Sequence, residues 1–277
     1  MKHRVYSTIF LWIAVIAPVC LWGVKASIWL LAIAATLTQY ELCFILVKMG
    51  FFPVTYVSMA LGFCLPLAIW YAPQNVEVGL DFFAFSIVIL SISILFEYLR
   101  DTQRARLIPT TFAFVYAPFL LSFYAMLVKH YADIGQEKEG LALVLWIIAV
   151  AKFTDVGALL TGNAIGRHKL APNISPKKTW EGAAGGTLAA IAISIGFLAA
   201  FGHWLPENFT IGKAIIFAVP VAIMSIISDL IESALKRMSS LKDSGNLIPG
   251  IGGIFDLTDS LILSAPLGFL LFKYSIF

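Results

Sequence analysis

The chain has 277 residues, of which 60% are hydrophobic and only 13% are charged, and its formal net charge is +3. A soluble globular domain carries about 45–50% apolar and about 25% charged residues. The composition therefore excludes a soluble enzyme, a disordered regulator and a disulfide-rich secreted scaffold, and the small net charge gives no indication of a nucleic-acid partner. It predicts an all-α, polytopic integral membrane protein.

Nine apolar stretches follow in chain order, each close to the ~20 residues that a helix needs to cross the hydrocarbon. They cover residues 6–23, 26–47, 52–72, 81–99, 109–129, 140–160, 183–202, 211–233 and 255–274. The first stretch follows basic residues, as in a signal peptide, but it lacks an A-x-A cleavage site and another span follows at once. We therefore expect it to be retained, which gives about nine transmembrane helices.

The lysines and arginines between these stretches predict the orientation. With the N-terminus in the cytoplasm, thirteen of the 19 basic residues lie on the cytoplasmic side, five lie on the opposite side and Lys152 lies within a span. An excess of basic residues marks the cytoplasmic side. We therefore expect a cytoplasmic N-terminus, a C-terminus outside, and two long cytoplasmic connections at 161–182 and 234–254.

Ionisable residues inside the spans need a reason, since each costs about 2.5–3.5 kcal/mol on insertion scales. The first half contains Glu41, for which an interhelical hydrogen bond is the plain explanation, and Glu97, which lies near a cytoplasmic helix end. In the sixth span, Lys152 and Asp155 are three residues apart and share a helix face. They form either a self-neutralising pair or a site residue with its counter-charge.

Carboxylates also gather at the start or end of the last two spans. The eighth span carries one polar stripe at helical spacing, formed by Ser225, Asp229, Glu232, Ser233 and Lys236. At the start of the ninth span, Asp256 and Asp259 again lie three residues apart. Clustered carboxylates without His or Cys partners suit a hard cation such as Mg²⁺, and nearby basic residues suit phosphate. The pattern predicts Mg²⁺-assisted chemistry on a phosphorylated substrate at the membrane surface.

The first long connection is basic and rich in hydroxyl groups. Its residues Ser175, Lys177, Lys178 and Thr179 are suited to holding phosphate oxygens, and Ser175-Pro176 is expected to begin a turn or a helix. The alternative is a basic anchor for the next span. That alternative does not explain the glycines at the start of the seventh span, which permit close helix packing or the approach of a ligand to the backbone: Gly182, Gly185 and Gly186.

The second long connection places three cations, Lys236, Arg237 and Lys242, before a glycine-rich stretch. The turns within residues 245–253 expose backbone N–H groups, which predict an anion nest just before Asp256.

These segments resemble the phosphatidate cytidylyltransferases, also called CDP-diacylglycerol synthases. Their signature is similar to Ser233-x-x-Lys236-Arg237-x4-Lys242-Asp243-x-Gly245-x2-Ile248-Pro249-Gly250-x-Gly252-Gly253-x2-Asp256-x2-Asp259. The segment from Asp155 through Ser175-Pro176-Lys177-Lys178-Thr179-Trp180-Glu181-Gly182 and the run Ser228–Ser233 also resemble that family. The resemblance covers about residues 155–260 closely, whereas the earlier spans match only in being apolar.

Three positions depart from the family's pattern. Ile251 stands where the family usually has His, Leu257 where it has Arg, and Ser228 where it has Gly. The missing His and Arg remove two partners for phosphate or protons. The aspartate pair at 256 and 259 and the Lys242-Asp243 dipeptide are intact, which favours retained metal chemistry.

The resemblance implies a reaction and a set of site residues. CTP and phosphatidate would give CDP-diacylglycerol and pyrophosphate for phospholipid synthesis. Asp229 and Asp256 would hold a metal pair that includes Mg²⁺, with K⁺ as one option for the second cation. The catalytic residues implied are Asp229, Lys242, Asp243, Asp256 and Asp259. The substrate-binding residues implied are Asp155, Ser175, Lys177, Lys178, Thr179, Glu181, Ser233, Lys236 and Arg237.

We expect an integral protein of a bacterial inner membrane, and the distribution of basic residues predicts that its active site faces the cytoplasm. Residues 1–139 would form a lipid-facing frame and residues 140–277 the catalytic region. The partners expected are CTP, phosphatidate and membrane lipids, with a homodimer left open. Three alternatives also stay open: a transferase for another lipid phosphate, a cation-coupled transporter and an inactive membrane scaffold. Transporter sites usually lie near the midplane in paired repeats, whereas these carboxylates gather in one half of the chain.

Overall fold

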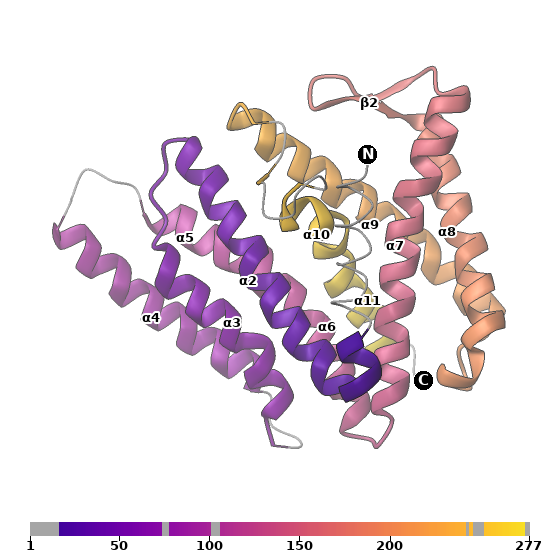
Figure 1. Cartoon of the computed structure of the whole chain (residues 1–277), viewed down its shortest axis with the longest axis horizontal. Helices are drawn as coiled ribbons and strands as arrows, with labels where there is room; N and C mark the ends of the chain where they lie inside the picture. Colours follow the sequence, from indigo (N-terminus) through magenta and orange to yellow (C-terminus); the bar gives the residue numbers. More distant parts are fainter. Residues whose placement is uncertain (1–16, 74–77, 101–105, 242–243, 246–251, 275–277) are drawn as a thin grey trace. The chain divides into compact units, whose positions relative to one another are not determined.

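The protein is described by a computed structural model, shown in Figure 1, that covers residues 17–73, 78–100, 106–241, 244–245 and 252–274. Almost all of these residues are helical. The helices before the first strand are α2 (Val24–Lys48), α3 (Thr55–Tyr71), α4 (Val78–Arg100), α5 (Leu107–Phe114), the π-helix η1 (Val115–Phe119), α6 (Leu120–Ala132) and α7 (Glu137–Ile165). Those after it are α8 (Trp180–Phe201), the 3-10 helix η2 (Gly202–Trp204), α9 (Ile211–Met238), α10 (Ile254–Ile262) and α11 (Ser264–Tyr274).

Within the described residues, 7 helices are long and apolar enough to cross a membrane, and α3 is a shorter apolar helix. The prediction of an all-α, polytopic membrane protein is therefore confirmed. Most of the first expected stretch, 6–23, lies outside the described residues, so the count of nine stays a prediction, as does the orientation of the termini.

Two of the expected spans are not uniform α-helices. The span Leu107–Ala132 passes through η1, which contains Pro118. Proline has no N–H to give to the helix, and a local π-turn accommodates that loss. The last span, Ile254–Tyr274, is interrupted at Leu263, between α10 and α11.

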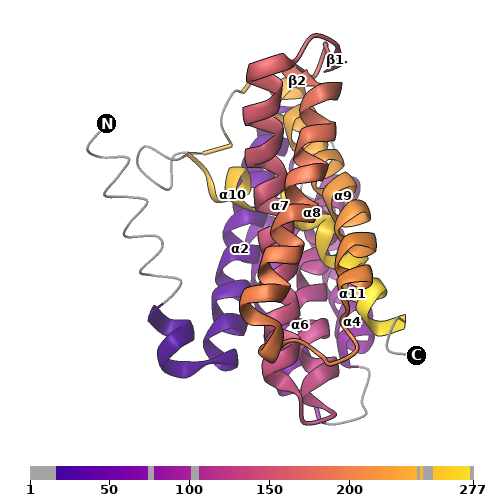
Figure 2. The same ribbon diagram turned by 90° about the vertical axis from the view of Figure 1, so that its right-hand side faces the viewer.

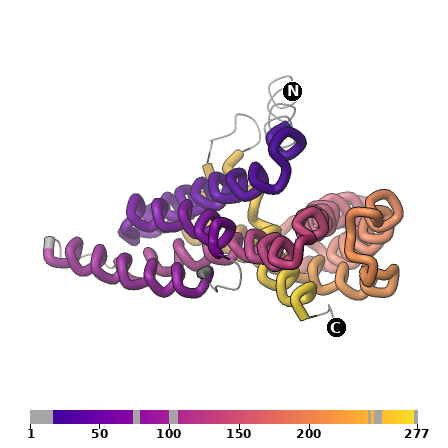
Figure 3. Tube along the Cα trace, turned by 90° about the horizontal axis from the view of Figure 1, so that it is seen from below, coloured from indigo at the N-terminus to yellow at the C-terminus, as the bar shows by residue number. Residues whose placement is uncertain are grey.

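The chain divides into two compact units. Unit 1 comprises residues up to Met126 together with Met238–Thr258, and unit 2 comprises Leu127–Arg237 together with the residues from Asp259 onward. In unit 1, α2 packs against α3, and α3 packs against α4 (Figures 1 and 3). Helix α2 contributes small and branched side chains to the core of unit 1: Ala32, Ala35, Leu42 and Ile45.

In unit 2, α7 and α8 lie side by side along most of their length (Figure 2). Glycines bring the two helices close together, since a Cβ added at Gly157 would lie 2.4 Å from that of Ala189 and one at Gly186 would lie 2.6 Å from the Thr154 carbonyl oxygen. Small residues allow such approach between membrane helices. The glycines at the start of α8 therefore serve helix packing, one of the two roles expected for them.

A β-hairpin connects α7 and α8 at one end of this helix pair (Figure 2). Strand β1 (Lys169–Ala171) pairs antiparallel with β2 (Ser175–Thr179). The expectation that Ser175-Pro176 begins a turn or a helix was therefore wrong. Helix α8 begins only at Trp180, where the Thr179 hydroxyl accepts a hydrogen bond from the Gly182 N–H at 3.0 Å and caps the helix.

Candidate active site

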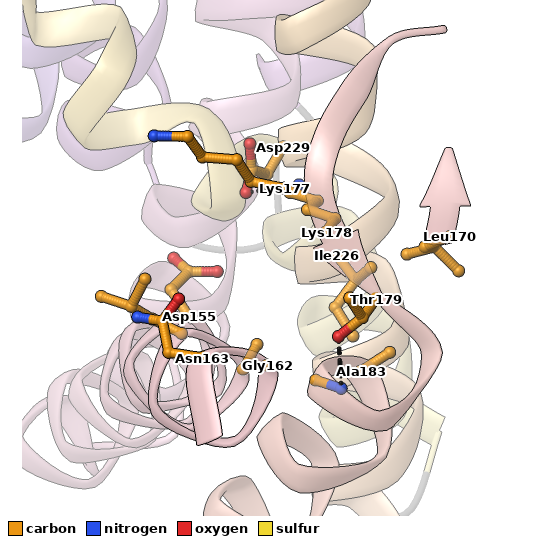
Figure 4. Close-up of a pocket in the computed structure, with 13 residues that line it drawn as sticks. Asp155, Gly162, Asn163, Leu170, Lys177, Lys178, Thr179, Ala183, Ile226 and Asp229 are labelled. Atoms are coloured by element: carbon orange, nitrogen blue, oxygen red, sulfur yellow. Dashed lines mark hydrogen bonds and ion pairs between the residues drawn. The ribbon is translucent and has the colours of Figure 1, made fainter. Parts of the chain in front are cut away.

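Unit 2 contains a cavity of about 310 Å³ between α7, the hairpin, α8 and α9 (Figure 4). Five residues predicted from the sequence line it, and they come from three elements: Asp155 on α7, Lys177, Lys178 and Thr179 on the hairpin, and Asp229 on α9. Apolar side chains share the wall, namely Leu159, Leu170 and Ile226. The cavity therefore combines cationic, anionic and apolar groups.

The closest charged contact in the cavity joins the hairpin to α9. The Lys178 Nζ lies 2.5 Å from the Asp229 Oδ2, with both side chains about three-quarters buried. One turn further along α9, the Ser233 hydroxyl donates to the Asp229 Oδ1 at 3.5 Å. Two predicted substrate-binding residues thus contact the aspartate that was predicted to hold a metal.

Asp229 also belongs to an acidic cluster within unit 2. One carboxylate oxygen from each of Asp229, Glu232 and Asp259 lies within 4.8 Å of the other two, a spacing that would allow all three to reach one cation. Sequence reasoning named Asp229 and Asp259 as site residues and placed Glu232 only on the polar stripe. The spacing of Glu232 three residues after Asp229 was the signal that pointed to it.

Each carboxylate of this cluster has a lysine partner. Asp229 pairs with Lys178, and the Glu232 Oε1 lies 2.7 Å from the Lys236 Nζ. The Lys152 Nζ lies 3.5 Å from the Asp259 Oδ1. Three lysines from α7, the hairpin and α9 thus balance three carboxylates.

Lys152 has more partners than a self-neutralising pair would require. Its ammonium lies 3.9 Å from the Asp155 carboxylate and donates to the Ser260 hydroxyl at 2.7 Å, in addition to its contact with Asp259. Lys152 therefore joins α7 to α10. Local spacing carries no signal for the long-range part of this contact, because Asp259 and Ser260 are distant from Lys152 in the chain.

The donor set fits a hard divalent cation. The cluster offers only carboxylate oxygens, which Mg²⁺ and Ca²⁺ prefer. Glu232 is 1% exposed and Asp259 is 9% exposed, so the ligands are largely shielded from water. The adjacent ammonium groups are suited to receive phosphate oxygens when a cation takes their place beside the carboxylates.

Two other predicted substrate-binding residues hold the hairpin. The Glu181 carboxylate accepts hydrogen bonds from the backbone N–H groups of Arg167, at 3.1 Å, and His168, at 3.2 Å, and it lies 2.6 Å from the His168 Nδ1. The Arg237 Nε donates to the Ile174 carbonyl oxygen at 3.2 Å. Ser175 begins β2, at the far end of the strand from Thr179.

In unit 1, Asp256 lies in the first turn of α10. Its Oδ2 accepts from the Gly253 N–H at 2.9 Å and from the Ser244 N–H at 3.4 Å. The Gly253 N–H was expected to contribute to an anion nest, but the chain's own aspartate occupies it. Lys242, Asp243 and Ile251 lie outside the described residues. The metal pairing of Asp229 with Asp256 stays a prediction.

Ser228, one of the three departures from the family pattern, lies buried where α10 gives way to α11. Its hydroxyl donates to the Asp259 carbonyl oxygen and accepts from the Leu263 N–H at 3.4 Å. A helix break inside a membrane leaves backbone groups that need partners. A glycine at this position has no side chain to supply them, so the serine gives the helix break a local partner.

Fold and site together define a polytopic membrane protein with a lysine-balanced acidic cluster beside a partly apolar cavity. Comparison with known proteins is more specific. The model of the cytidylyltransferase family matches residues 2–275, and the chain therefore belongs to that family.

Curated relatives match the chain over part of its length. It is 37% identical over 149 residues to the phosphatidate cytidylyltransferase of Haemophilus influenzae, an alignment that covers 54% of this chain and 51% of the relative. The corresponding protein of Brucella suis is 41% identical over 140 residues, covering 49% and 48%. That of Thermotoga maritima is 33% identical over 186 residues, covering 65% and 66%. The matched part of the chain thus spans about half the length of the first two relatives.

Proposed function

We propose that the protein transfers the cytidylyl group of CTP to phosphatidate and forms CDP-diacylglycerol and pyrophosphate. The observation that carries this proposal is the cluster of Asp229, Glu232 and Asp259, in which each carboxylate is matched by a lysine. Membership of the cytidylyltransferase family and the similarity to phosphatidate cytidylyltransferases support the choice of substrates. The product would serve phospholipid synthesis.

In this proposal, Asp229, Glu232 and Asp259 would hold Mg²⁺. The resemblance also implies Asp256 as a metal ligand, and K⁺ is one option for a second cation. Bound there, the cation supplies positive charge to the triphosphate of CTP. The lysines around the cluster would supply further positive charge to the phosphate groups. Lys178 and Lys177 lie on the hairpin beside the cavity, where they would bind phosphate oxygens of either substrate.

The reaction itself needs little acid–base help from the chain. An oxygen of the phosphatidate phosphate attacks the α-phosphorus of CTP, a new P–O bond forms, and the bond to the bridging oxygen of pyrophosphate breaks. A phosphate monoester has a second pKa of about 6, so the attacking phosphate is largely ionised at neutral pH. The charge that grows on pyrophosphate is what Lys178, Lys236 and Arg237 would stabilise.

The apolar part of the cavity is suited to a lipid substrate. Leu159 and Leu170 line it together with Ile226, beside the charged residues. Phosphatidate would enter from the bilayer with its phosphate toward the lysines and its acyl chains toward the lipid. We place the protein in a bacterial inner membrane with this site on the cytoplasmic side, as the distribution of basic residues predicts.

Purified full-length protein, reconstituted in lipid with CTP, Mg²⁺ and phosphatidate, tests the proposal. We expect CDP-diacylglycerol and pyrophosphate in equal amounts, no product when diacylglycerol replaces phosphatidate, and no product when the Mg²⁺ is chelated. Product from another lipid phosphate only would favour the related transferase. If no lipid phosphate gives product, the transferase proposal is wrong.

A further inference from the structure

Unit 1 contains a carboxylate that the proposed reaction does not use. Glu41 lies in α2, well inside an apolar span, and is 2% exposed. Its Oε2 accepts hydrogen bonds from the Ser244 hydroxyl and the Phe255 N–H, both at 2.8 Å, and its Oε1 accepts from the Ile254 N–H at 3.1 Å. These donors all belong to the segment that ends in the first turn of α10.

Glu41 thereby acts as the cap of a helix in a distant part of the chain. The first N–H groups of a helix have no partner within it, and a side chain at the N-cap position usually supplies one. Gly253, which precedes α10, has no side chain. Glu41 takes over that function for Ile254 and Phe255, and its negative charge lies where the helix dipole favours an anion.

The glycines of this segment fit around the Glu41 carboxylate. A Cβ added at Gly245 would lie 2.6 Å from the Glu41 Oε1, 2.9 Å from its Cδ and 3.4 Å from its Cγ. A Cβ at Gly253 would lie 2.1 Å from the Glu41 Oε2 and 2.0 Å from the Ser244 Oγ. Any side chain at either position would therefore displace the carboxylate from its donors.

The same segment holds Asp256 in place. Ser244 gives its hydroxyl to Glu41 and its N–H to Asp256, and Gly253 gives its N–H to Asp256 while its neighbours Ile254 and Phe255 bond to Glu41. Because adjacent groups of a short backbone segment bind both carboxylates, the position of Asp256 depends on Glu41.

We propose that Glu41 is a positioning residue, which fixes the start of α10 and thereby the carboxylate of Asp256. This inference rests on the proposed function, in which Asp256 is a metal ligand. The simpler alternative is that Glu41 only helps to pack α2 against α10. That alternative has its own contact, the 2.8 Å hydrogen bond between the hydroxyls of Thr38 and Thr258, which makes the two roles separable.

The first experiment compares Glu41→Gln with Thr38→Val. The glutamine keeps the shape of the side chain but turns one acceptor oxygen into an NH₂ group that faces N–H or O–H donors. We expect kcat to fall about tenfold or more and the Mg²⁺ concentration for half-maximal activity to rise about tenfold, in the range known for residues that orient metal ligands. The KM for phosphatidate should stay unchanged. Thr38→Val removes the α2–α10 hydrogen bond and the bond from the same hydroxyl to the Ala34 carbonyl oxygen, but it leaves Glu41 and its donors in place. Both quantities should therefore stay within about twofold of the unmodified protein.

Equal Mg²⁺ dependence in the unmodified protein and Glu41→Gln would overturn the inference, as would equal shifts in Glu41→Gln and Thr38→Val. If the unmodified protein makes no product, the proposed function fails instead. Hydrogen exchange does not depend on activity. The amides at the start of α10 should exchange faster in Glu41→Gln and at the normal rate in Thr38→Val, without added metal or substrate.

A second variant keeps the inference testable if Glu41→Gln does not fold. Gly245→Ala should reproduce the Mg²⁺ shift, because the nearest atoms to the added methyl group all belong to Glu41. In a Glu41→Ala background those atoms are gone, so adding Gly245→Ala should change neither the melting temperature nor the exchange rate further. Additive effects in the double variant would contradict a contact between the two positions.

Discussion

The two units stabilise the carboxylates of their helices in different ways. In unit 1, Glu41 accepts hydrogen bonds from a hydroxyl and two backbone N–H groups, which are neutral and fixed by the fold. In unit 2, Asp229, Glu232 and Asp259 lie beside lysine ammonium groups on flexible side chains. Neutral, fixed donors suit a permanent anchor. Ammonium groups suit a site whose partners change, since a lysine released by a cation can turn to phosphate.

The largest expected effect comes from removing a carboxylate whose lysine partner can be replaced by a cation. Asp229→Asn keeps the shape of the side chain but removes a charge that would bind the cation, so kcat should fall about 10²–10³-fold, the equivalent of about 3–4 kcal/mol. Steady-state assays with CTP and phosphatidate measure the loss. Asp133→Asn is the matched control, because it breaks the 2.9 Å ion pair with Lys129 elsewhere in unit 2 and should leave kcat within about twofold. Full activity in Asp229→Asn would refute the metal assignment.

The second-largest effect separates the two roles proposed for Lys178, which are to bind phosphate and to balance the charge of Asp229. Lys178→Met should lower kcat/KM about 10–100-fold, because a phosphate contact is lost. It should also lower the Mg²⁺ concentration for half-maximal activity, because the Asp229 carboxylate no longer has an ammonium group 2.5 Å away that competes with the cation. A Mg²⁺ titration of the variant measures both effects. Lys178→Arg keeps the charge, so its kcat/KM and its Mg²⁺ requirement should lie between those of the unmodified protein and those of Lys178→Met. A higher Mg²⁺ requirement in Lys178→Met would contradict the exchange of partners.

Much of this site follows from local spacing in the sequence. The apolar runs predicted the helices, because a membrane span must be about 20 residues long whatever it packs against. The pairs Asp229–Ser233 and Glu232–Lys236 are four residues apart in one helix, and the structure places both in contact. The predicted stripe on α9 was therefore readable before any tertiary structure was known.

The remaining contacts have no local signal. Lys178 reaches Asp229 from a hairpin, and Glu41 reaches Phe255 across 214 residues of sequence. Such pairs are set by helix packing, which the spacing of residues along the chain does not reveal. The hairpin itself was missed because β1 is only 3 residues long and contains no clear alternation. Glu41 looked like an ordinary interhelical hydrogen-bonding residue for the same reason.

A smaller effect tests whether Lys152 balances charge or only fills space. Lys152→Met leaves Asp155 and Asp259 without their shared ammonium group, so the free energy of unfolding should fall by about 1–2 kcal/mol. This loss is smaller than for a fully buried ion pair, because the lysine side chain is 34% exposed and water screens its charge. Thermal unfolding in detergent measures the change. Adding Asp155→Asn removes one of the unbalanced charges and should restore part of the loss. If the double variant is less stable than Lys152→Met alone, charge balance is not what Lys152 supplies.

The smallest expected effect concerns Glu181, which lies in unit 2 but accepts hydrogen bonds from fixed backbone donors, as Glu41 does in unit 1. Glu181 accepts from the backbone N–H groups of Arg167 and His168, as Glu41 does for the start of α10. Glu181→Gln should therefore loosen the hairpin that carries Lys177 and Lys178, raise the KM for CTP about two- to fivefold and leave the Mg²⁺ requirement unchanged. His168→Ala removes the ring partner but keeps both backbone donors, so it should change the KM less. Limited proteolysis of the hairpin gives a readout that is independent of turnover. A Mg²⁺ shift in Glu181→Gln as large as that in Asp229→Asn would place Glu181 among the metal ligands and end the distinction between fixed anchors and exchangeable charges.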